Sequence, residues 1–228
     1  MRRYLLAVLL LGTAAGSASA AERDFPNAGF DKVDLAAAAE IDVHTGGRFA
    51  VHASGDPKWL DLLNVHVVQG TLVIGWNRRH VSMNAHHPIR IQVSMPRISG
   101  ATISGAGTIR IDRAETPDFA AVIKGAGTID LPALHAERAH FEMGGAGKIT
   151  AIGSAGSVDA RVGGFGALEL AGLAAREGRF DMAGTGSIKA RVNGPADVAM
   201  NGVGSVDVGG NPRCSVHKSG LGSVRCGG

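Results

Sequence analysis

A short glycine motif that recurs seven times constrains this sequence more than any other feature. Each copy holds a Gly-x-Gly pair followed by alternating apolar and polar residues, as in SGAGTIRI (104–111) and KGAGTIDL (124–131). The paired glycines are Gly105 and Gly107, Gly125 and Gly127, Gly145 and Gly147, Gly164 and Gly166, Gly184 and Gly186, Gly202 and Gly204, and Gly220 and Gly222. Successive copies lie 20, 20, 19, 20, 18 and 18 residues apart. Units repeated at one such period indicate coils that stack on one another.

The apolar residues of each unit alternate with polar ones, which is the period of a β-strand with one buried face. A second alternating stretch, which includes Phe119, Phe141 and Phe180, precedes the later motifs with the same parity. Strands that recur once per coil pair in parallel with their successors. We therefore predict an all-β fold, a right-handed parallel β-helix with coils of 18–20 residues. The glycines would lie at one corner of each coil, where the chain pinches or takes positive φ.

Polar residues, all but one of them charged, occupy the opposite parity, five positions after the first glycine of each motif. Stacking of the coils predicts an exposed ladder of these residues, in which opposite charges are neighbours: Arg110, Asp130, Thr150, Glu169, Lys189, Asp207 and Arg225. Exposed pairs of this kind contribute little free energy each. We interpret the ladder as a determinant of register and solubility.

Residues 1–20 have the pattern of a secretory signal peptide, with two arginines, a short apolar run and an Ala-Ser-Ala cleavage site. The apolar run is too short to span a membrane. We expect residues 21–228 to form a single β-helix domain with irregular coils over 21–96 and regular Gly-x-Gly coils over 97–228. The sequence predicts an exported protein, periplasmic or at the cell surface, with no membrane span after signal cleavage.

Two cysteines, Cys214 and Cys226, are the only ones in the sequence. Export exposes them to an oxidising compartment, so we expect a disulfide between them, with two free thiols as the alternative. The chain without its signal peptide has almost balanced charge and no basic run with interleaved aromatic residues. Nucleic acid is therefore excluded as a partner.

The sequence resembles the bacterial head GIN-domain family, whose members are described as autotransporter adhesins. The repeated S-G-x-G-[ST]-[IV] strings carry this resemblance over roughly residues 30–226. Three segments before the repeats add to it: Asp42-Val43-His44, Gln69-Gly70-Thr71-Leu72-Val73-Ile74 and Val93-Ser94-Met95-Pro96. The resemblance implies a right-handed parallel β-helix akin to pectate-lyase folds, without catalytic residues, and a role in adhesion.

Glycine-rich strings also suggest nucleotide or calcium binding, but neither pattern is complete here. The third glycine of a dinucleotide fingerprint is missing, and core residues fill the slots where calcium repeats place aspartate. A polar stretch carries His80, His86 and His87, which we interpret as a solvated loop, with a metal or anion site as the alternative. We predict no catalytic residues, no cofactor and no metal site.

Binding surfaces leave a fainter signal in the sequence. The residue between the paired glycines becomes more apolar along the chain and includes Phe165, Val203 and Leu221. These three form a candidate interface if they face outward, although packing against loops is the favoured interpretation. We predict a non-catalytic envelope or adhesion-type binding module, with an envelope or host polysaccharide or a protein as its partner. The alternatives are a polysaccharide-active lyase or hydrolase, which would use outward carboxylates such as Asp130, Glu169 and Asp207, and a structural envelope component with a protein partner.

Overall fold

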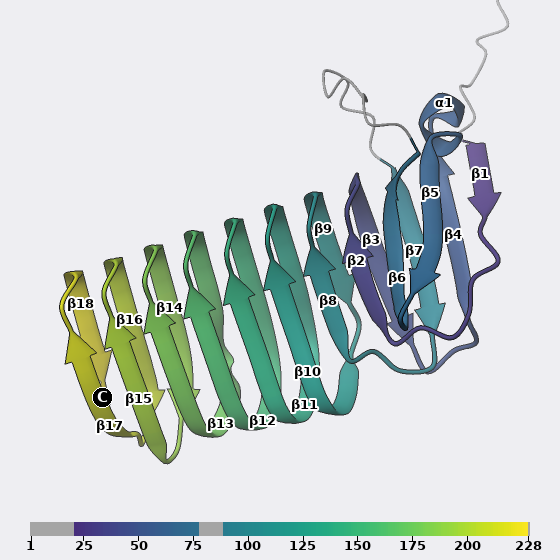
Figure 1. Ribbon diagram of the computed structural model, residues 1–228. Helices are drawn as coiled ribbons and strands as arrows, with labels where there is room; N and C mark the ends of the chain where they lie inside the picture. The colour runs from purple at the N-terminus through teal and green to yellow at the C-terminus, as the bar shows by residue number, and fades with distance from the viewer. Residues whose placement is uncertain (1–20, 78–88, 228) are drawn as a thin grey trace, which may run out of the picture.

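β-Strands make up 75% of the structure, a computed structural model that describes residues 21–77 and 89–227 (Figure 1). The first seven strands are β1 (Ala21–Asp24), β2 (Lys32–Leu35), β3 (Ala38–Thr45), β4 (Ala50–Gly55), β5 (Leu63–Val68), β6 (Thr71–Trp76) and β7 (Arg90–Met95). A short helix, α1 (Pro57–Leu60), separates β4 from β5.

The remaining strands wind in a β-solenoid of about six turns. They are β8 (Gly100–Ile103), β9 (Ala106–Ile111), β10 (Ala114–Ile123), β11 (Ala126–Met143), β12 (Ala146–Val162), β13 (Phe165–Met182), β14 (Thr185–Val192), β15 (Pro195–Met200), β16 (Val203–Gly210), β17 (Arg213–Lys218) and β18 (Leu221–Cys226). Figure 1 shows the coils side by side in chain order from β8 to β18. The predicted all-β solenoid is confirmed. Its right-handedness and its likeness to pectate-lyase folds stay predictions.

Two long parallel ladders run along the solenoid. The first ladder joins the Gly-x-Gly segments, so that Ile109, Ile129 and Ile149 stand in register. The second ladder joins β8, β10, the later halves of β11, β12 and β13, and then β15 and β17. A shorter ladder at Leu134–Ala136 lies between them in the chain. The repeat spacing therefore predicted the register of the regular coils.

The core is filled by the inward residues of both ladders, and large side chains stack against small ones. Along one inward row of the second ladder, Ala121, Phe141, Ala160 and Phe180 follow one another in register. All four are buried. Phe141 has alanine in both adjacent coils, and Phe180 lies between Ala160 and Val198, so large and small side chains alternate to fill the interior.

Glycines mark the corner at which each coil enters the first ladder. A Cβ atom on Gly145 would come closer than 3.0 Å to the carbonyl oxygens of Gly125 and Lys124 in the preceding coil. The next glycine, Gly147, has a φ of 148°, which L side chains rarely adopt. The amide of Ala146 donates to the Gly125 carbonyl oxygen at 2.9 Å, so the two coils are held together where a side chain would separate them.

The N-terminal coils are not stacked in chain order. Strand β2 pairs in parallel with both β6 and β8, and β3 pairs in parallel with both β7 and β9. The coil formed by β2 and β3 therefore lies between two coils that follow it in the chain.

Antiparallel strands close the N-terminal end of the stack. Strand β4 pairs with β7 and β1 with β4, while β5 and β6 form a hairpin. The hairpin turns at Gln69 and Gly70, which have φ values of 48° and 75°. Helix α1 follows β4, and the Asp56 side chain accepts a hydrogen bond from the Lys58 amide at 2.9 Å. Figure 1 shows α1 and β1 at the end opposite β17 and β18.

Candidate functional site

A groove of about 920 Å³ runs along the outer face of the second ladder. Residues of one parity on this ladder fill the core, so the residues between them point outward and line the groove. The charged or titratable residues that line it come from several successive coils: Asp31, Lys32, Asp118, Arg138, His140, Asp159, Glu177, Arg179 and Asp197. A second hollow of about 710 Å³ continues past Arg179 and Asp197 to Ser215 and His217.

Parallel register sorts the groove residues into columns in which opposite charges alternate. One column contains His140, Asp159, Arg179, Asp197 and Ser215. A neighbouring column contains Asp118, Arg138, Ser157 and Glu177. A third contains Glu142, Arg161, Asp181, Ala199 and His217. Successive coils are about 4.8 Å apart, so the groove repeats its polar groups at that interval.

Ion pairs occupy the part of the groove nearer the N-terminus. Arg138 donates from Nε and Nη2 to the two carboxylate oxygens of Asp118, at 2.5 and 2.7 Å. These hydrogen bonds lower the pKa of Asp118 and raise the pKa of Arg138. Arg161 donates to Oδ2 of Asp159 at 2.9 Å, and Nδ1 of His140 lies 3.9 Å from Oδ1 of the same carboxylate.

The part nearer the C-terminus carries unpaired groups. Among the residues that the structure describes, Glu177, Arg179, Asp181 and Asp197 have neither a side-chain hydrogen bond nor an ion pair. Oδ1 of Asp181 is shielded from solvent and accepts no hydrogen bond, as is also true of Oδ1 of Asp159 in the other part of the groove. Because charged groups gain most from directed hydrogen bonds, this end of the groove has the greater capacity to bind a polar ligand.

The charges that the sequence singled out lie on the first ladder, outside the groove. Their predicted order is confirmed, because Asp130 pairs with Arg110 and Lys189 pairs with both Glu169 and Asp207 in the strand register. The side-chain ion pairs are less regular than the strand register. Lys189 reaches Glu169 at 3.2 Å, whereas Arg110 turns from Asp130 towards Glu40 and Asp42 at 3.9 and 3.8 Å.

Sequence reasoning missed the groove residues of the second ladder. The signal for them was present, because charged residues stand between the buried positions around Phe119, Phe141 and Phe180 at the same period as the glycines. Arg138, Arg179 and their neighbours could have been assigned to outward columns in this way. The bend that makes this face concave is not encoded in the alternation.

The residues between the paired glycines form a continuous outward row, here called the crest: Ala106, Ala126, Ala146, Phe165, Thr185, Val203 and Leu221. The side chains of Phe165, Val203 and Leu221 are 69, 48 and 76% exposed. The expectation that these three pack against loops is wrong, since the glycine corner turns them away from the core.

A disulfide joins Cys214 and Cys226, which links β17 to β18 in the last coil. His80, His86 and His87 lie outside the described residues. Within residues 21–77 and 89–227, no group of three or more His, Cys, Asp or Glu side chains could hold a metal ion. Helices of a length and apolarity sufficient to span a membrane are likewise absent from this described part of the chain.

These features define a β-solenoid that presents side chains at regular intervals along a groove and a crest. The chain belongs to the family described as "Putative auto-transporter adhesin, head GIN domain", which residues 29–212 match. The resemblance found in the sequence is thereby confirmed. A search of curated proteins gave no match.

Solved structures share the fold. One described as a putative adhesin of Bacteroides fragilis is 24% identical, with a TM-score of 0.83, and the match covers 91% of this chain and 97% of that one. One described as a putative lipid binding protein of Parabacteroides distasonis is 16% identical, with a TM-score of 0.69 and coverage of 92% and 97%. A putative adhesin of Parabacteroides merdae is 14% identical, with a TM-score of 0.64 and coverage of 92% and 96%.

Proposed function

We propose that this protein is an exported, non-catalytic binding module of the cell envelope, of the adhesion type, which holds an extended polysaccharide along its groove. The observation that carries the proposal is the set of unpaired charges at the C-terminal part of the groove. Arg179 and Asp197 stand in register on adjacent coils, and both line the groove and the hollow that continues it. They supply donors and acceptors to a ligand without first breaking a contact within the protein.

The repeat favours a polymer over a compact ligand. A chain that follows the groove meets a new set of charged or hydroxyl-bearing side chains at every coil, about 4.8 Å further on. Hydroxyl and carboxylate groups repeated along a polysaccharide match such a series through hydrogen bonds. An extended chain can therefore engage several coils at once.

Binding without cleavage agrees with the ion pairs in the part of the groove nearer the N-terminus. A glycoside hydrolase needs a carboxyl that stays protonated as general acid, which requires a raised pKa. The pKa of Asp118 is instead lowered by Arg138, and Asp159 is tied to Arg161. Membership in a family described as adhesins supports the same conclusion, and the signal peptide predicted over residues 1–20 supports export.

The test is retention of purified protein (residues 21–228) on an array of envelope and host polysaccharides, with two matched double variants. Arg179→Ser with Asp197→Ser alters the groove. Lys189→Ser with Asp207→Ser alters a pair that stands in register on the first ladder. Loss of charged hydrogen bonds predicts at least about tenfold weaker binding for the groove variant and unchanged binding for the control.

Two results would overturn the proposal. Retention on no polysaccharide would leave a protein partner or a purely structural role in the envelope. Release of shortened or unsaturated chains from a bound polysaccharide would show a hydrolase or a lyase.

A further inference from the structure

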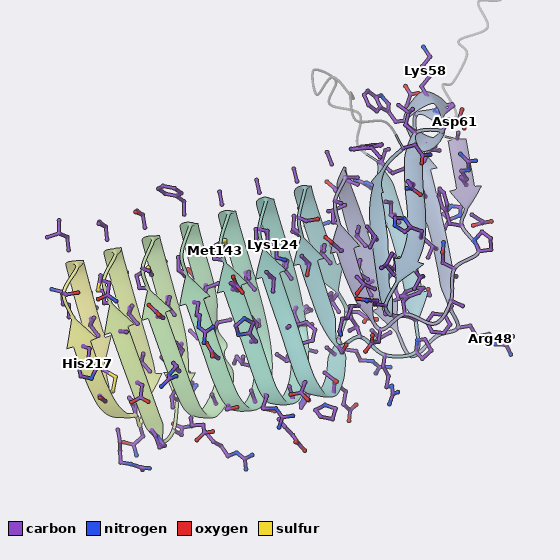
Figure 2. All side chains as sticks on the ribbon, viewed as in Figure 1. Arg48, Lys58, Asp61, Lys124, Met143 and His217 are labelled. Atoms are coloured by element: carbon purple, nitrogen blue, oxygen red, sulfur yellow. A yellow bond between two sulfur atoms is a disulfide. The ribbon has the colours of Figure 1, made fainter. Side chains whose placement is uncertain are left out.

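The crest is an apolar edge with no cover in the described part of the protein. Phe165, Val203 and Leu221 expose about half to three quarters of their surface, although each is flanked by glycines whose Cβ positions are occupied by the preceding coil. Those glycines fix the backbone so that the residue between them points away from the core. The starts of β9, β14, β16 and β18 lie along the upper edge of the coils in Figure 1, and Figure 2 shows side chains standing clear of the ribbon there.

Carboxylates are absent from the rows beside the crest, all of which the structure describes. The residues two positions before the crest are Ser104, Lys124, Gly144, Gly163, Ala183, Asn201 and Ser219. The residues two positions after it are Thr108, Thr128, Lys148, Ala167, Ser187, Ser205 and Ser223. These rows and the crest therefore contain two charged side chains, both lysines. The next row on one side includes three carboxylates, and the next row on the other side includes two.

The two lysines stand in the two coils that precede the apolar part of the crest. Both Lys124 and Lys148 are exposed, and Lys148 pairs in register with Ala167, which is two residues from Phe165. The rest of the strip, from Phe165 to Leu221, is uncharged over about 15 Å, since neighbouring coils are about 4.8 Å apart. The strip formed by the crest and the two rows beside it thus has a cationic part and an apolar part along one edge.

We propose that the crest is a lipid-contact edge, which enters the interfacial region of a bilayer that contains anionic lipid. A projecting row of apolar side chains between small uncharged neighbours can enter the boundary between headgroups and acyl chains. Lys124 and Lys148, which form no ion pair with any described residue, are complementary to anionic headgroups. A partner protein would need a matching furrow, whereas a lipid surface adapts to a convex edge. The inference concerns a different surface from the polysaccharide groove and does not depend on it.

The experiment is cosedimentation of residues 21–228 with vesicles of phosphatidylcholine alone and with vesicles of phosphatidylcholine and phosphatidylglycerol in equal parts. Wild-type protein is expected to bind the second kind more strongly. Phe165→Ser with Leu221→Ser should weaken that binding at least about tenfold, because two large apolar side chains no longer leave water. The control, Val68→Ser with Ile152→Ser, alters two other apolar side chains, each 48% exposed, and should bind as wild type does.

Two further variants separate the contributions of the lysines and of the groove. Lys124→Gln with Lys148→Gln should weaken binding to the anionic vesicles and leave binding to phosphatidylcholine unchanged. Arg179→Ser with Asp197→Ser should leave vesicle binding unchanged, so failure of the groove and failure of the crest are distinguishable. Circular dichroism verifies that each variant is folded.

Three outcomes would overturn the inference. The first is no binding of wild-type protein to either vesicle, and the second is equal weakening by the crest and control variants. The third is a wild-type dimer in gel filtration that the crest variant converts to monomers without any vesicle binding. That third outcome would assign the crest to contact between copies of this chain.

Discussion

Replacement of Gly145 by alanine tests the glycine corner at a tightly packed point. A Cβ atom there would come closer than 3.0 Å to the Gly125 carbonyl oxygen and to the carbonyl carbon and oxygen of Lys124. All three are backbone atoms of the preceding coil, so they cannot rotate away as the end of a flexible side chain could. Gly145 does not have positive φ, and the expected effect is therefore steric.

The magnitude follows from the hydrogen bonds that join the two coils at this corner. The amide of Gly145 donates to the Ile123 carbonyl oxygen, and the amide of Ala146 donates to that of Gly125, both at 2.9 Å. Separating the coils enough to admit a methyl group stretches both bonds. Gly145 is partly exposed and Ala146 is exposed, and such a hydrogen bond contributes about 0.5–1.5 kcal/mol net, so we expect a loss of about 1–3 kcal/mol. That is a substantial part of the roughly 5–15 kcal/mol that stabilises an ordinary domain.

The assay is urea unfolding followed by circular dichroism, with Gly144→Ala as the matched control. A Cβ atom on Gly144 would lie 3.8 Å from the Ile123 carbonyl oxygen, an ordinary contact. Both substitutions restrict the unfolded chain equally, so their difference reports the folded state. We expect Gly144→Ala to stay within about 0.5 kcal/mol of wild type. Gly145→Val should lower the free energy of unfolding more than Gly145→Ala does. Equal midpoints for the two alanine variants would refute the steric role of the glycine corner.

Three further predictions concern the core, the last coil and the groove. Phe141→Ala should destabilise by about 3–5 kcal/mol, because alanines in the coils on either side cannot fill the cavity, whereas Phe165→Ala on the crest should change urea midpoints little. Reduction of the Cys214–Cys226 disulfide should remove about 3 kcal/mol and lower the Tm, and an unchanged Tm in reductant would contradict this. Since its arginine partner lowers the pKa of Asp118, the ionised form is favoured in the folded state, and that stabilisation exists above the usual aspartate pKa. The advantage of wild type over Asp118→Asn in urea unfolding should therefore be full at neutral pH and vanish as pH falls through the lowered pKa; a pH-independent difference would refute it.

The regular coils could be predicted from sequence because one repeat fixes both face and register. Once Gly127 is aligned with Gly107 and Gly147, the facing of Ile129 and the neighbours of Asp130 follow from a period of two. The outward position of Phe165 was harder to predict, because alanines occupy the equivalent positions in the earlier coils. Alternation says nothing about whether a loop covers such a residue.

The N-terminal coils could not be predicted to the same depth. Val33 and Leu35 alternate as a half-buried strand should, which specifies the buried face but not the neighbouring strand. The antiparallel β4 has the same alternation as the parallel β3. The groove was missed for a related reason, because its concavity depends on how the coil bends between Leu131 and Arg138.

The interleaved coil of β2 and β3 has a consequence for the order in which the chain folds. In the regular coils, each strand pairs with residues 18–20 positions away in the chain. Val33 instead pairs with Leu72 and Ala101, which are 39 and 68 residues further along. Contacts so distant in sequence close large loops and form slowly. We expect the regular coils to assemble first and residues 32–45 to insert late. During synthesis, this N-terminal segment would therefore reach its native position only after the strands that follow it in the chain have been made.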